Sequence, residues 1–389
     1  MNLGAIGSAL KLVAIFPIGF ALISGMSGSF IRLTPAIIVQ FLFVLWAALS
    51  IFWSISIDAS LERALSYFLL FLLIFSGTFF RYTESEIKKV KYALAWSSRL
   101  TAVIMLIFAE YIEGRFWLKG IIEENPNYLC AYFAFGIVFA IEKLTQNKKI
   151  FPKLMAIAEL CLYFYLVLVS GSRGGLLAVA AAAIAYSLTF GKNTAKNTFV
   201  KIILVVFLFV LFSILLDNLP EFLKERFTVD DVIESGGTGR VDLWKQTFDL
   251  FETSSIFRQL FGYGSGTILV AFTQHGYHTV NVAHNIFLEN LADLGIVGVA
   301  LYSIAIFLFI KSSFKEKDKF SFSVICCMFV LSLSASLATF KPYFNIMLFI
   351  IMLQNLQSTE QINTKTAESR YDRERKYANV NHRYPGIQR

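Results

Sequence analysis

Charged residues are scarce in this sequence. Asp, Glu, Lys and Arg make up 16% of its 389 residues, against roughly 25% in an average soluble protein, while 56% of the residues are hydrophobic. Too few polar side chains are present to cover a water-soluble protein of this length. The composition also excludes a disordered chain, a collagen, a coiled coil and a disulfide scaffold. A polytopic membrane protein of the all-α class remains.

Metal-ligand and barrel signals are also lacking. The four cysteines all lie in apolar stretches without metal-ligand spacing, so we interpret them as small core residues. The spacings among His275, His278 and His284 fit no standard zinc motif, and we therefore expect no metal and no cofactor. The alternation typical of outer-membrane strands and any internal repeat are both absent.

Long apolar runs are abundant, and each is near the roughly 20 residues that a helix needs to cross a bilayer. Helices are expected because an open sheet edge cannot be hydrated in lipid. We predict eleven spans, over 12–28, 35–56, 62–80, 93–110, 127–142, 154–170, 174–190, 200–217, 284–310, 320–338 and 341–355.

The net charge of +8 suggests nucleic acid in a soluble protein, but the positions of the basic residues give a different interpretation. Of the 35 Lys and Arg residues, 23 fall on one set of alternate connections, which the positive-inside rule makes cytoplasmic. This orientation predicts a cytoplasmic C-terminus, an external N-terminus and no nucleic-acid partner. A signal peptide over 12–25 is a less favoured alternative.

The membrane domain is predicted to occupy residues 1–355, followed by a disordered cytoplasmic tail over 356–389. The one large connection, 218–283, is external. Within it, Val241–Phe251 has the apolar spacing of an amphipathic helix that lies on the surface or on the bilayer.

Arg173 is the first polar residue that requires a functional explanation. It lies in Ser170-Gly-Ser-Arg-Gly-Gly175, between two strongly apolar helices at the external side. Arginine at membrane depth is costly, and it usually faces a cavity or a partner. The neighbouring glycines would let a ligand approach, and the N-terminus of the next helix favours an anion. The structural alternative is a hairpin turn whose arginine reaches lipid headgroups.

Arg240 has a similar setting in Thr238-Gly-Arg-Val-Asp-Leu-Trp244, where a glycine-rich backbone enters the amphipathic helix. This again favours an anion at a helix start. The segment lacks the Lys-Ser/Thr ending of a nucleotide-binding loop. A flexible loop with a capping threonine is the structural alternative.

The start of the ninth span gathers His284, Asn285, Glu289 and Asp293. Histidine exchanges a proton near neutral pH, and Asn285 suits hydrogen bonding to a sugar or a phosphate. Carboxylates within an apolar helix are themselves functional candidates. A single histidine is more often structural.

Asn127 and Tyr263 are candidate residues for lining a substrate. Asn127 closes Asn125-Pro-Asn127 at the start of a span, where capping is a sufficient structural explanation. Tyr263, in Phe261-Gly-Tyr-Gly264, could stack on a sugar ring, although helix packing is the more common use of an aromatic side chain.

The order of these motifs along residues 120–300 resembles the O-antigen ligase and polymerase superfamily of bacterial inner-membrane glycosyltransferases. The resemblance implies an inverting transferase that opens to the periplasm and uses an undecaprenyl-diphosphate-linked glycan. Its acceptor would be lipid A–core in a ligase, or a second lipid-linked repeat unit in a polymerase. Members commonly have about twelve spans, whereas we predict eleven.

The resemblance also implies residue roles. Arg173 and Arg240 match the arginines that bind the donor diphosphate, and His284 matches the catalytic histidine. In an alternative assignment, Glu289 or Asp293 is the base and His284 orients the acceptor. An anion transporter is a further alternative, disfavoured because the polar residues gather at one face and not at the midplane. The last alternative is a non-catalytic protein that takes part in envelope assembly.

Overall fold

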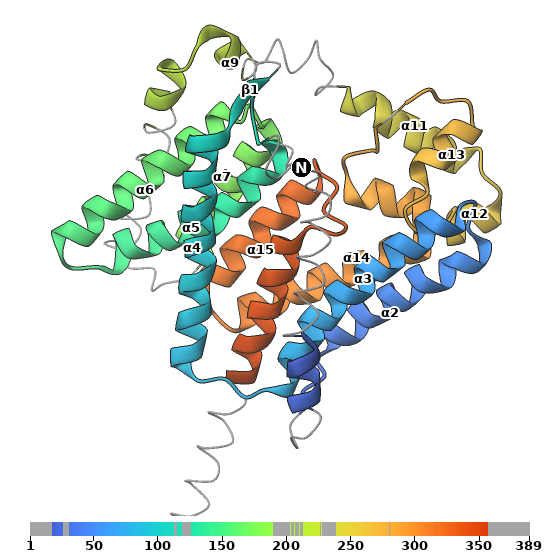
Figure 1. The fold of residues 1–389 in the computed structure, drawn as a ribbon, viewed down its shortest axis with the longest axis horizontal. Coiled ribbons are helices and arrows are strands. Elements are labelled where there is room, and N and C mark those ends of the chain that lie inside the picture. The colour runs from blue at the N-terminus through green and yellow to red at the C-terminus, as the bar shows by residue number, and fades with distance from the viewer. Residues whose placement is uncertain are drawn as a thin grey trace, which may run out of the picture.

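The computed structural model describes residues 18–25, 31–112, 115–118, 126–189, 213–225, 239–279 and 281–356, together with residues 203, 206, 210 and 227. Helices dominate these ranges (Figure 1). Most of the predicted spans 12–28 and 200–217 and almost all of the tail lie outside the described residues.

Among the described residues, six helical segments are long and apolar enough to cross a membrane, which confirms a multi-pass all-α membrane protein. They are α2 (Pro35–Leu49) with η1 (Ser50–Trp53), α3 (Ile57–Ser76) with η2 (Gly77–Phe79), α4 (Glu84–Phe108), α5 (Pro126–Gln146), α6 (Ile150–Val169) and α14 (Ile286–Lys315). Shorter apolar helices are α7 (Arg173–Thr189), α15 (Lys319–Ser332) and a last helix over 341–356.

Two predicted boundaries were wrong, for identifiable reasons. The predicted span 93–110 begins at Glu84, because Thr83 and Glu86 form a reciprocal capping box in a polar segment that hydropathy overlooks. The chain then forms a hairpin of β1 (Glu110–Ile112) and β2 (Arg115–Trp117), which was not predicted. The predicted span 320–338 ends at Ser332, and residues 333–340 turn into the last helix.

The connection between the eighth and ninth predicted spans contains α9 (Glu221–Glu225), α11 (Arg240–Glu252), α12 (Ile256–Phe261) and α13 (Ile268–Gln274). We call residues 239–279, which hold α11 to α13, the outer layer. The predicted amphipathic helix is confirmed as α11, which buries Leu243, Thr247 and Leu250. Figure 1 shows the outer layer beside the upper ends of α2 and α3.

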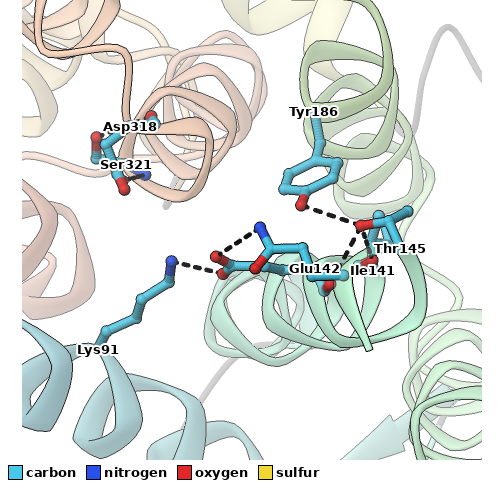
Figure 2. A network of polar contacts seen from close by, with 8 residues as sticks. Lys91, Ile141, Glu142, Thr145, Tyr186, Asp318 and Ser321 are labelled. Carbon is cyan, nitrogen blue, oxygen red and sulfur yellow. Dashed lines mark hydrogen bonds and ion pairs between the residues drawn. The ribbon is translucent and has the colours of Figure 1, made fainter. Parts of the chain in front are cut away.

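A polar network joins α4, α5 and α7 at the end that the positive-inside rule makes cytoplasmic, and Figure 2 also shows Asp318 at the start of α15. Lys91 on α4 pairs with Glu142 on α5 at 2.5 Å. One turn later, the Thr145 hydroxyl lies 3.3 Å from the Tyr186 hydroxyl on α7. Asp318 caps α15 by accepting from the Ser321 amide. These contacts fix the bundle at the end opposite to the outer layer.

A second ion pair crosses the bundle near its middle. Arg99 on α4 donates from both Nε and Nη2 to Glu159 Oε1 on α6, at 3.1 and 2.9 Å. Because α4 begins at Glu84, Arg99 lies well inside its helix. Charges at such depth require partners, and this pair therefore ties α4 to α6.

Candidate active site

The turn between α6 and α7 presents Arg173 at the first position of α7. Gly171 takes a positive φ of 60°, which lets the chain reverse. Ser172 then caps α7, because its hydroxyl accepts from the Gly175 amide at 3.0 Å. Arg173 is thereby held at a helix start, as the sequence predicted.

The glycines after Arg173 serve protein packing, which differs from the expectation that they admit a ligand. A Cβ on Gly174 would overlap the Ser334 hydroxyl, and one on Gly175 would overlap the Cys130 thiol. The same Cβ position on Gly174 lies 3.7 Å from Arg240 Nη1. The small residues thus allow the 333–340 turn, α5 and Arg240 to converge on the start of α7.

Arg240 begins α11 after Gly239, whose φ is 75°. Trp244, one turn further on, donates from Nε1 to the Ala283 carbonyl at 2.9 Å. This bond places the start of α11 against the segment that carries His284. Arg240 supplies a positive charge at the start of α11, and the Trp244 hydrogen bond holds this helix in place.

Arg240 and Arg173 lie close enough to repel each other. Burial lowers the pKa of Arg240, and the positive charge of Arg173 lowers that pKa further. Within the described part of the chain, no carboxylate pairs with Arg240. Two half-buried guanidinium groups that repel each other form a site that an anion would stabilise.

His284 lies beside this pair, half-buried and with a positive φ of 49°, which is uncommon outside glycine. Burial lowers its pKa below the usual 6.5, and the charge of Arg240 lowers it further. The imidazole is therefore neutral at neutral pH and able to accept a proton. The fold thus brings Arg173, Arg240 and His284 near one another, and their roles in binding and catalysis stay predictions.

Asn285 is a helix cap in the structure. Its Oδ1 accepts from the amides of Phe287 and Leu288 at 3.0 and 3.4 Å, which fixes the start of α14. The substrate-lining role expected for it stays a prediction.

Glu289 is 4% exposed and lies one turn below His284. Its carboxylate accepts from the Ser336 hydroxyl, and it lies near the His284 backbone. The Ser336 carbonyl accepts in turn from the Tyr128 hydroxyl at 3.2 Å. Glu289 thus links the segment that holds His284 to the 333–340 turn and to α5.

Asp293 holds the outer layer to α14. Its two carboxylate oxygens accept from three successive amides, those of Gly266, Thr267 and Ile268, at 2.7 to 2.9 Å. These amides open α13, where a carboxylate is favoured by the helix dipole. Both carboxylate oxygens are engaged by the protein, which favours a structural role for this residue.

The helix α14 is broken at Gly295, whose φ of 67° and ψ of −169° are not helical. The break frees two carbonyls, and the outer layer satisfies both: the Tyr263 amide donates to Ala292 and the Gly264 amide to Asp293. Trp46 Nε1 donates to the Leu294 carbonyl at 3.1 Å. The outer layer and α14 are therefore joined by backbone hydrogen bonds into one unit.

Tyr263 and Asn127 are placed by other contacts. The Tyr263 hydroxyl lies 2.7 Å from Ser254 and 3.2 Å from His275, and its ring packs in the apolar core of the outer layer. Asn127 accepts from Arg115 Nη2 at 3.0 Å. Their substrate-lining roles stay predictions.

Two arginines were missed by sequence reasoning. Arg115, on β2, donates from Nε to the Ser170 carbonyl at 2.9 Å and so supports the turn that carries Arg173. Arg63, on α3, lies close enough to Tyr67, Asp293 and Glu289 to interact with them electrostatically. A charge within an apolar span was the available signal for Arg63.

The described residues include no group of three or more His, Cys, Asp and Glu that could hold a metal ion. What the fold and the site define is a multi-pass membrane protein with a cationic, histidine-containing cluster at one end of its helix bundle.

Comparison with known protein families shows which family part of the chain is similar to. Residues 159–303 match the family model described as O-Antigen ligase, a range that includes Arg173, Arg240, His284, Glu289 and Asp293. Residues 159–303 are therefore similar to this family, which supports the resemblance to the O-antigen ligase and polymerase superfamily. No curated protein matches the chain.

Replacing Asp293 by Asn tests its role as a clamp. The amide nitrogen would face backbone donors, so at least one of the three bonds is lost at a cost of roughly 1–3 kcal/mol. We expect faster hydrogen exchange at Gly266–Ile268 and a lower thermal midpoint. Unchanged exchange there, together with lost activity, would contradict the clamp and favour a direct catalytic role.

The lowered pKa of His284 predicts the acidic limb of the pH profile. With His284 as a base, which must be deprotonated to act, we predict that kcat/KM rises with pH through this pKa and that the midpoint lies below 6.5. Arg240→Gln removes the repelling charge and should move the midpoint of the residual activity upward, while Arg240→Lys should not. A midpoint that is the same in all three proteins would contradict the coupling.

Proposed function

We propose that the chain transfers a glycan from undecaprenyl diphosphate to an acceptor at the periplasmic face of the bacterial inner membrane. The observation that carries the proposal is the juxtaposition of Arg173 and Arg240 with a neutral His284. The O-antigen ligase domain at residues 159–303 supports a lipid-linked glycan as the substrate.

Donor binding follows from the electrostatics of the arginine pair. A diphosphate carries two to three negative charges, and it would offset the repulsion between Arg173 and Arg240. Fixed guanidinium groups near low-dielectric lipid interact with such charge more strongly than they would in water. The polyprenyl chain would lie along the apolar helices of the membrane domain.

The reaction requires one proton transfer. The acceptor hydroxyl oxygen attacks C1 of the donor sugar, the bond from C1 to the diphosphate oxygen breaks, and the configuration at C1 inverts. His284 takes the hydroxyl proton, and undecaprenyl diphosphate leaves with the bonding electron pair, its charge stabilised by the two arginines.

Glu289 and Asp293 fit this scheme as positioning residues. Asp293 already accepts three amide bonds, and Glu289 accepts from Ser336 and lies near the His284 backbone. Both carboxylates thereby fix the segment that carries His284. This favours His284 as the base over the alternative in which a carboxylate takes the proton.

Bound donor would also raise the basicity of His284. Diphosphate charge beside Arg240 offsets the positive field that lowers the pKa of the imidazole. The base would then become stronger when the donor is in place.

A ligase and a polymerase would share this donor chemistry and differ in the acceptor. In a deletion strain, loss of all repeats from lipopolysaccharide with accumulation of lipid-linked polymer indicates a ligase, which is our leading proposal. A single repeat still attached to core indicates the polymerase alternative. Normal lipopolysaccharide would exclude both of these acceptor assignments.

Neutral substitutions at the arginines test the proposed site. We expect Arg173→Gln and Arg240→Gln each to lower kcat by about 10²–10³-fold, the typical effect of removing one fixed transition-state donor. His284→Gln should be at least as severe. Glycan transfer by purified protein in liposomes measures the effect.

Lys245→Gln is the matched control, because Lys245 lies on α11 with Arg240 but is exposed to solvent. Its activity should stay within twofold of the unsubstituted protein. Equal activity of the control and of the three site variants, all inserted stably, would contradict the proposed site.

A further inference from the structure

The short helix α12 turns its apolar side chains outward. Ile256 is 75% exposed, Phe257 is 48% exposed, and Leu260, one turn after Ile256, is also exposed. None of the six residues of α12 is buried. A helix in water would be expected to expose its polar residues instead.

The polar side chains of α12 are turned back into the protein. Arg258 Nη1 donates to the carbonyls of Trp53 and Gly262 at 2.8 and 3.2 Å, and its guanidinium stacks over the Tyr263 ring at 5.0 Å. Gln259 Nε2 donates to the carbonyls of Phe251 and Ser254 at 3.1 and 3.3 Å. The outward side of α12 is therefore left without a charged group.

This exposed face continues onto the membrane helices. Phe257 and Phe261 pack against the Trp53 ring, at 6.3 and 6.0 Å between centroids. Next to Trp53, Phe52 is 86% exposed, and Ile57 opens α3 with its side chain also exposed. Further along α2 and α3, exposed apolar residues include Leu45, Leu49, Leu61, Leu65 and Phe68.

The location of α12 fits the edge of a bilayer. In Figure 1, α12 lies lower than α11 and α13, beside the upper ends of α2 and α3. Both of those helices belong to segments long and apolar enough to span a membrane. An apolar face that continues such helices at their ends meets the acyl chains just below the lipid headgroups.

We propose that α12, together with Phe52 and Ile57, is inserted into the leaflet next to the outer layer and contacts its acyl chains. The occupant of this face is lipid, because the face is continuous with the lipid-facing sides of α2 and α3.

The backbone of α12 is connected to the candidate active site through α14. A Cβ on Gly262, at the end of α12, would overlap the Asp293 carbonyl, and a Cβ on Gly295 would overlap that of Leu260. The backbones of α12 and the broken part of α14 are therefore in direct contact. The depth of α12 in the leaflet therefore sets the position, relative to the bilayer, of the α14 segment that begins beside His284.

Spin labelling of the full chain in liposomes tests the insertion without an activity assay. Ile256→Cys carries the label on α12, and Lys245→Cys is the matched control, because the Lys245 side chain is also 75% exposed. Phe257→Cys provides a second position. Chain without an introduced cysteine serves as the labelling blank, because it has four native cysteines.

We expect the labels at 256 and 257 to be more accessible to oxygen, which partitions into lipid, than to a water-soluble nickel chelate. The label at 245 should show the reverse order. Labels at 256 and 257 that favour the nickel chelate as the control does would overturn the proposal. Labels shielded from both agents would also overturn it, and would indicate a protein partner or a second copy of the chain.

Discussion

The break of α14 at Gly295 is the constraint on which the site depends. It exposes carbonyls inside an apolar protein, where they require partners, and residues 263–264 of the outer layer supply them. Asp293 adds a carboxylate that gathers three amides at the start of α13. Through these bonds, one membrane helix and the outer layer become a single body, so Arg240 and His284 keep a fixed relation.

The unfavourable electrostatics of the cluster are consistent with anion binding. Arg173 and Arg240 repel each other, and Arg240 lowers the pKa of the neighbouring imidazole. The rigid surroundings, including the Ser172 cap and the Trp244 bond, hold these groups together despite the repulsion. A diphosphate would relieve the repulsion and raise the basicity of His284, so substrate binding and proton transfer become coupled.

The sequence predicted the membrane helices, α11 and the candidate residues, because hydropathy, amphipathic spacing and ordered motifs are local signals. It missed the start of α4, since the capping box lies in a polar segment, and it gave no sign of the break at Gly295. Ser336 went unnoticed because a serine in an apolar stretch has no distinguishing pattern. The electrostatic interaction of Arg63 with Glu289 and Asp293 acts between helices more than 200 residues apart in the sequence.

The central claim is that Arg173 and Arg240 bind one diphosphate between them. A double-mutant cycle on binding of undecaprenyl diphosphate in liposomes measures this directly. We predict that Arg173→Gln and Arg240→Gln each weaken binding, that the double variant loses less than the two losses added, and that undecaprenyl monophosphate shows less coupling. Additive losses, or binding unchanged by either substitution, would contradict the account.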